Sequence, residues 1–145
     1  MRLVVQRVKN TSVSVKKAIV GKINEGLFVL VGVKETDSEK EAEFLADKLI
    51  KLRIMSDSQG KMNLSVKDVK AGILVVSQFT LYADTSGGNR PSFVEAAEPQ
   101  KAEKIYNYFL TVLRDKDVRV ETGIFGKYMS IETVLDGPVT IILEK

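Results

Sequence analysis

The order in which strand and helix patterns follow one another restricts the possible folds of this chain more than any other sequence feature. Polar residues alternate with Val and Leu over residues 2–8 and 12–15, residues 18–23 favour a third strand, and residues 27–33 form an apolar run typical of a central strand. No helical pattern separates these segments. Because parallel neighbours need long crossover connections, an antiparallel or mixed sheet is favoured over a doubly wound parallel one.

Two later segments have the hydrophobic spacing of amphipathic helices. Ser38 with Glu41 forms a capping-box pattern ahead of apolar residues that recur at helical spacing as far as Leu52. A second helix is predicted from Pro99, where proline suits a first turn, to Arg114. Further short strands are expected at residues 53–55, 72–78, 118–121, 131–134 and 139–143. With no internal repeat or linker, residues 1–145 are predicted to form a single α+β domain.

The composition excludes several chemistries. The chain has no His and no Cys, so it offers no imidazole base, no thiolate nucleophile and no Cys-type zinc site. We find no carboxylate cluster with ligand spacing and no glycine-rich phosphate or dinucleotide motif, so neither metal nor cofactor is predicted. No apolar stretch approaches the ~20 residues of a membrane span, and the N-terminus does not resemble a signal peptide. We therefore expect a cytoplasmic protein without membrane contact.

The net charge of +3 is modest, but the basic residues are unevenly distributed. Those that precede the first acidic residue, Glu25, are Arg2, Arg7, Lys9, Lys16, Lys17 and Lys22. If the strands that carry them lie side by side, they form a basic face able to meet RNA phosphates. The alternative is that lysines on solvent-facing and edge strands only prevent aggregation.

Three segments could carry chemistry. Residues 77–84 place hydroxyl and amide groups at the end of an apolar strand, where they could build a site or could only satisfy backbone groups. Thr80 has neither a His nor an N-terminal amine to activate it, so a non-covalent role is favoured over a nucleophile. Gly137-Pro138 could be a simple turn. Phe125, in a glycine-flanked loop, could stack on a nucleobase or anchor the core.

Four segments in chain order resemble the D-aminoacyl-tRNA deacylase family. They read SQFTLYAD at residues 77–84, RPSF at 90–93, ETG with FG at 121–126, and DGPVT at 136–140. The opening residues Met1-Arg2, the segment Gln6-Arg7-Val8 and the segment GKMNLS at residues 60–65 share the similarity. The resemblance extends over essentially the whole chain without large gaps.

The resemblance implies a homodimer with a barrel-like core and active sites at the subunit interface. Such enzymes hydrolyse the ester that joins a D-amino acid, or glycine mischarged on tRNA(Ala), to the 3′-terminal adenosine of tRNA, a proofreading step in translation. It assigns the pocket to Ser77, Gln78, Phe79 and Thr80 as catalytic residues, with Ala83 beside them, and to Phe125 and Met129 near the adenosine. It also implies a cis Gly137-Pro138 peptide that reaches into the partner's pocket and excludes L-amino acids.

The missing histidine agrees with that chemistry. An aminoacyl ester is already activated, and the vicinal hydroxyl of the adenosine can assist the attacking water, so the protein need only position the ester and offer N–H groups to the oxyanion. The main-chain N–H groups of Phe79 and Thr80 are predicted to serve. The competing interpretations are a non-catalytic RNA-binding module and a dimer that binds a small molecule.

Overall fold

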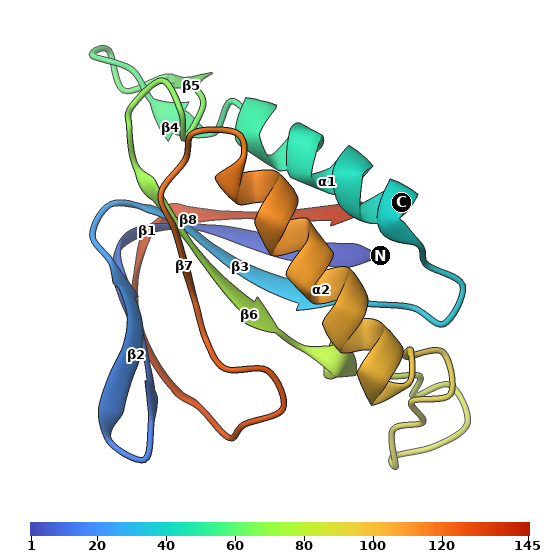
Figure 1. The fold of residues 1–145 in the computed structure, drawn as a ribbon. Coiled ribbons are helices and arrows are strands. Elements are labelled where there is room, and N and C mark those ends of the chain that lie inside the picture. Colours follow the sequence, from blue (N-terminus) through green and yellow to red (C-terminus); the bar gives the residue numbers. More distant parts are fainter.

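The computed structural model describes residues 1–145 and shows a strongly curved mixed sheet with two helices on its outer face (Figure 1). The strands of the main sheet are β1 Arg2–Val15, β2 Ala18–Ile23, β3 Gly26–Gly32, β6 Gly72–Ser77, β7 Val120–Thr122 and β8 Ser130–Glu144. Strands β3, β6 and β7 run parallel to one another, whereas β1 pairs antiparallel with β2, β3 and β8. The expected mixed sheet is confirmed.

Strand β1 bends, and this bend nearly closes the sheet into a barrel. Its first half pairs with β3 and its second half with β2, while β8 pairs along its other edge. The bend carries β2 across to β7 and β6, where a Cβ added to Gly21 would lie 2.5 Å from the Thr122 carbonyl oxygen and 2.9 Å from Leu74 Cδ1. A side chain at Gly21 would therefore push the two ends of the sheet apart.

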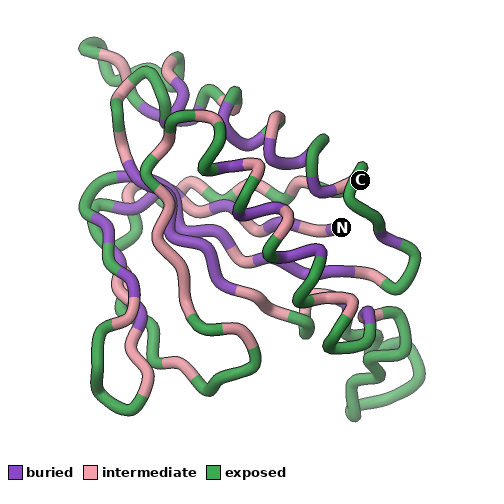
Figure 2. Tube along the Cα trace, in the orientation of Figure 1, coloured by how far each residue is buried: buried purple, intermediate pink, exposed green.

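The curved sheet separates two hydrophobic clusters. The larger one lies between the outer face of the sheet and the helices α1 Glu39–Lys51 and α2 Pro99–Arg114, and it includes Leu3, Val29 and Phe109. The smaller one fills the barrel interior and consists of Val8, Val13, Ile23, Phe28, Leu74 and Val76. Figure 2 shows the buried residues along the central strands and the inner sides of the helices.

Both predicted helices are confirmed. Helix α1 begins after Ser38, whose hydroxyl accepts from the Lys40 N–H while the Glu41 carboxylate accepts from the Ser38 N–H at 2.8 Å. This is the predicted capping box. Helix α2 begins at Pro99 and ends at Arg114. Neither helix is long and apolar enough to span a membrane.

Several predicted strand boundaries were wrong, and the strand predicted at residues 118–121 is β7 Val120–Thr122. Residues 2–8 and 12–15 belong to the single strand β1, because exposed Lys9 and Asn10 interrupt the apolar alternation without ending the pairing with β8. Residues 131–134 and 139–143 likewise belong to β8, and Gly137-Pro138 lies in a bulge inside that strand. The strand predicted at 53–55 is β4 Met55–Ser56, which pairs with the unpredicted β5 Met62–Leu64.

Candidate functional site

The end of β6 leads into a single turn of 3-10 helix, η1 Phe79–Tyr82. The Gln78 N–H donates to the Val31 carbonyl at 2.7 Å, and the first donor of the turn is Leu81, which bonds to the Gln78 carbonyl at 3.3 Å. The N–H groups of Phe79 and Thr80 precede that donor and have no acceptor within the turn. Two backbone donors therefore lie at the exposed end of a buried strand.

Neighbouring residues hold η1 in place. A Cβ on Gly32 would lie 3.0 Å from Leu81 Cβ and 3.3 Å from the Gln78 carbonyl oxygen, so a side chain there would push the turn away from β3. The Arg2 guanidinium donates to the Leu81 carbonyl at 2.6 Å and lies 4.9 Å from the centre of the Tyr82 ring. Burial raises the pKa of the Tyr82 phenol, so Tyr82 stays neutral and does not serve as a base.

The exposed surface of η1 combines an aromatic pair with polar groups. Phe79 is 57% exposed and makes an edge contact with Phe93, with ring centres 4.9 Å apart. The Gln78 side-chain amide donates to the Thr80 hydroxyl at 2.6 Å. Ala83 is exposed directly after the turn. The hydroxyl of Thr80 thus accepts from an amide, and no base is bonded to it.

The loop after β7 lies at the same edge of the sheet, because β7 runs parallel to β6. A Cβ on Gly123 would lie 2.5 Å from Met129 Sδ and 3.4 Å from Val76 Cγ2, so Met129 packs beside the last residues of β6. Phe125 is half-buried against Tyr106 of α2, with ring centres 5.8 Å apart. The ring of Phe125 is thus anchored on the core with one part accessible.

The peptide bond between Gly137 and Pro138 is cis, and both residues are exposed. Gly137 has φ +133°, and a Cβ there would lie 2.6 Å from the Val139 nitrogen, which requires glycine. The bulge that contains them lies opposite Arg7 of β1. Gly137 and Pro138 therefore form a protruding, sterically defined segment of β8.

Arg7 anchors this bulge from beneath. Its side chain is 10% exposed, and its Nε lies 2.8 Å from Asp136 Oδ2. Its Nη1 donates to the Ile54 carbonyl at 2.8 Å and to the Ser56 hydroxyl at 3.3 Å. The sequence alone does not reveal the roles of Arg7 and Asp136, since only the register of β1 on β8 shows that residues so distant in the chain meet.

The two groups of predicted site residues lie at opposite ends of the sheet. Arg7, under the bulge, pairs with Leu27 of β3, and Leu27 pairs with Ile73 at the start of β6. Ser77 lies four residues further along β6. Since β6 is also three strand spacings from β8, the distance from Ser77 to the bulge is about 20 Å. One chain therefore brings together Ser77, Gln78, Phe79, Thr80, Ala83, Phe125 and Met129, but not Gly137 and Pro138.

No ionisable side chain is present between Ser77 and Ala83 apart from the phenol of Tyr82. No group of three or more acidic, His or Cys side chains is arranged to hold a metal. The edge can therefore act on a bound molecule through hydrogen bonds, aromatic contact and shape.

Comparison with known proteins identifies the family. The family model described as D-Tyr-tRNA(Tyr) deacylase matches residues 4–144. The chain belongs to this family. Deacylases are hydrolases, so the membership also gives the class of enzyme.

Individual deacylase relatives match over nearly the full length. A D-aminoacyl-tRNA deacylase of Dehalococcoides mccartyi is 56% identical over 99% of this chain and 94% of its own length. A solved structure named c-Myc DNA Unwinding Element Binding Protein is 42% identical, covers 100% of this chain and 99% of its own, and superposes with a TM-score of 0.94. A structure described as a probable eukaryotic D-amino acid tRNA deacylase shares the fold, with a TM-score of 0.82, 17% identity and coverage of 98% and 97%.

Proposed function

We propose that this protein hydrolyses the ester bond of D-aminoacyl-tRNA, releasing the D-amino acid and free tRNA as a proofreading step in translation. The observation that carries the proposal is the edge at η1, where the free N–H groups of Phe79 and Thr80 stand beside exposed aromatic and amide groups and where residues 77–83 include no acidic or basic side chain. Such an edge suits a substrate that is already activated. Residues 1–145 act as one unit in this proposal, in keeping with the family match over residues 4–144.

In the proposed reaction, a water oxygen adds to the ester carbonyl carbon and the bond from that carbon to the ribose oxygen breaks. The vicinal ribose hydroxyl relays the proton from the water to the leaving oxygen, so no protein base is needed. The N–H groups of Phe79 and Thr80 donate to the oxyanion that forms on the carbonyl oxygen, and one such donor contributes roughly 10²–10³ in rate. The ring of Phe125 and the side chain of Met129 contact the terminal adenosine and line the pocket.

The proposed site is completed by a second copy of the chain. Gly137 and Pro138 lie about 20 Å from Ser77 within one chain, so they can reach a site at η1 only from another subunit. The sheet also has an uncovered apolar row on the face turned away from the helices. In that row Ile142 is 64% exposed, and Val4 and Leu30 beside it are half-buried. A homodimer packed on this face would bury that row.

The proposed dimer explains selection of handedness through the backbone. The carbonyl groups of the exposed residues Gly137 and Pro138 would hold the substrate ammonium and occupy the volume that an L side chain needs. A D side chain would point away from these carbonyl groups and make no contact that distinguishes one side chain from another. Glycine has no side chain to clash, so glycyl-tRNA(Ala) is also a substrate in this proposal. A tRNA substrate is in keeping with an enzyme of the cytoplasm.

The test compares D-tyrosyl-tRNA with L-tyrosyl-tRNA under single-turnover conditions, with glycyl-tRNA(Ala) and two further D-aminoacyl-tRNAs as additional substrates. The expected result is cleavage of every D-aminoacyl ester and of the glycyl ester, while the L-ester survives. A strong preference for one D side chain would refute backbone selection, and absence of cleavage of any ester would refute the enzymatic proposal.

The second candidate is a nucleic-acid-binding protein without catalysis. The 42% identical structure is named for binding a DNA element. This candidate predicts salt-dependent binding to many DNA and RNA sequences and no loss of ester from D-tyrosyl-tRNA. The same ester assay therefore separates the two functions.

A further inference from the structure

The hairpin between β1 and β2 ends in a turn that is unusual for its sequence. Val15 pairs with Ala18, so Lys16 and Lys17 are the two residues of the turn. Their φ angles are +49° and +69°. A two-residue hairpin turn with both φ angles positive strongly prefers Asn-Gly, because a side chain with a Cβ is unfavourable in this region. The chain therefore keeps two lysines at positions where they oppose folding, which points to a function for their charge.

The hairpin tip lies at the same edge of the sheet as η1. Gly72 contacts Ile23, and Gly21 contacts Leu74, so β2 runs antiparallel to β6 and Lys17 reaches the level of Gln78. Near Gly21 and Gly72 the two strands approach to side-chain contact across the barrel. In Figure 1 the hairpin tip, the loop after β7 and the segment after η1 all lie along the lower side of the molecule.

This edge carries four basic groups that are free. Besides Lys16 and Lys17, the loop after β7 contributes Lys127 and the segment after η1 contributes Arg90, all of them exposed. None of the four forms an ion pair or a side-chain hydrogen bond within the chain. The acidic residues near them include Asp84, whose carboxylate accepts from the Ser86 N–H at 2.9 Å, Glu95, which pairs with Lys34 at 3.5 Å, and Glu132, which lies opposite Ser12 in the β1–β8 ladder.

We infer that the hairpin tip of Lys16 and Lys17, together with Lys127, is a docking surface for the phosphate backbone of the nucleic acid whose 3′ end enters the site at η1. This inference rests on the proposed function, which places an RNA ester at η1. Flexible, strongly charged lysines at a protruding turn suit contact with phosphates without reading of sequence. The surface would hold the substrate body and leave the chemistry to η1.

The decisive variant is Lys16→Asn/Lys17→Gly, since it removes both charges and supplies the preferred turn residues. It should raise the melting temperature by about 2–8 °C. Its kcat/KM for D-tyrosyl-tRNA at 0.15 M salt should fall by about fivefold for each phosphate that the variant no longer binds, and the salt slope of log kcat/KM should fall by about one for each such phosphate. Its kcat/KM for D-tyrosyl-adenosine, which carries no phosphate, should stay unchanged.

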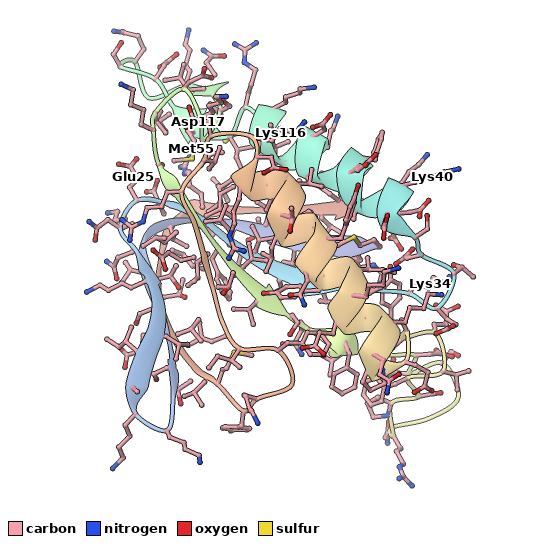
Figure 3. All side chains as sticks on the ribbon, in the orientation of Figure 1. Glu25, Lys34, Lys40, Met55, Lys116 and Asp117 are labelled. Atoms are coloured by element: carbon pink, nitrogen blue, oxygen red, sulfur yellow. The ribbon has the colours of Figure 1, made fainter.

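A matched control uses the outer helix α1, where Lys40 is labelled in Figure 3. Lys40 and Lys48 are both exposed there, and neither forms an ion pair. The variant Lys40→Gln/Lys48→Gln removes the same charge from a surface that carries neither half of the proposed site. It should cleave D-tyrosyl-tRNA with wild-type kcat/KM and salt slope.

Two results would overturn the inference: a kcat/KM for D-tyrosyl-tRNA within twofold of wild type in Lys16→Asn/Lys17→Gly, or an equal decrease in the control variant. Failure of the proposed function is recognised separately, because the wild-type protein would then cleave neither tRNA nor adenosine ester. In that event the dissociation constants for uncharged tRNA decide, since the inference requires weaker binding by the hairpin variant alone.

Discussion

Replacing Arg7 by methionine removes the anchor beneath the β8 bulge without leaving a large void. The guanidinium is nearly buried, pairs with Asp136 at 2.8 Å and donates to the Ile54 carbonyl at 2.8 Å. Loss of one partner from a fully buried ion pair costs about 3–5 kcal/mol, whereas exposed pairs contribute at most about 1 kcal/mol. Because the Asp136 side chain is 33% exposed, we expect Arg7→Met to lower the free energy of unfolding by about 2–4 kcal/mol.

A double-mutant cycle with Asp136→Asn isolates the pair itself. Urea unfolding at one fixed protein concentration gives the four free energies, because the stability of the proposed dimer would depend on concentration. The Arg2–Glu144 pair provides the control, since its side chains are 33% and 49% exposed. We expect a coupling energy of about 1.5–3 kcal/mol for Arg7–Asp136 and below about 1 kcal/mol for Arg2–Glu144.

Arg7→Met should also have a functional effect. Once Arg7 is removed, the bulge that carries Gly137 and Pro138 is less well held, so the ratio of D- to L-tyrosyl-tRNA hydrolysis should fall at temperatures where the variant remains folded. A decrease in stability below about 1 kcal/mol, or a coupling energy equal to that of the control pair, would refute the role of Arg7 as the anchor.

Three further predictions concern the bulge, η1 and α1. Gly137→Ala should destabilise by about 1–3 kcal/mol in urea unfolding, because its Cβ would lie 2.6 Å from the Val139 nitrogen at a φ of +133°; an unchanged midpoint would contradict this. Thr80→Val should keep deacylation within about tenfold of wild type, since the N–H donor remains; an inactive but folded variant would restore Thr80 as a nucleophile. Ser38→Ala should cost about 1 kcal/mol at pH 7. The Ser38 hydroxyl lowers the pKa of Glu41, so this contribution is present above the usual Glu pKa of about 4.3 and is lost as the pH falls through the lower folded-state pKa. The difference in stability between wild type and Ser38→Ala should therefore narrow at about pH 3, and a constant difference would contradict the pairing.

Local patterns predicted the helices and the central strands because their signals are contained in short stretches of sequence. The capping box at Ser38 and the proline at Pro99 mark the helix starts directly. The continuity of β1 and β8 was not predictable in this way. The apolar alternation fails at Lys9 and Asn10 of β1 and around residues 136–139 of β8. At both places the hydrogen bonds between β1 and β8 keep the flanking backbone extended.

The candidate site shows the same division. The polar run at the end of β6 was visible as a strand exit, and the structure does place Ser77 to Ala83 at an exposed edge. The ion pair of Arg7 and Asp136 depends on a register that joins residues more than a hundred positions apart. The strain of the Lys16-Lys17 turn also became visible only when its φ angles were known.

The proposed mechanism depends most on a site shared between two subunits, and a mixing experiment tests this directly. Phe79→Pro removes one proposed N–H donor. Proline suits the first position of a helical turn, and the preceding Gln78, with ψ 88°, has the non-helical backbone that proline requires before it. Gly137→Ala alters the other half of the site. Each variant alone should have little activity on D-tyrosyl-tRNA. When the two variants are refolded together in equal amounts, half of the dimers contain one copy of each variant. Each of these mixed dimers has one intact site of two, so activity should return to about a quarter of wild type. Activity no greater than the average of the separate variants would contradict the shared site.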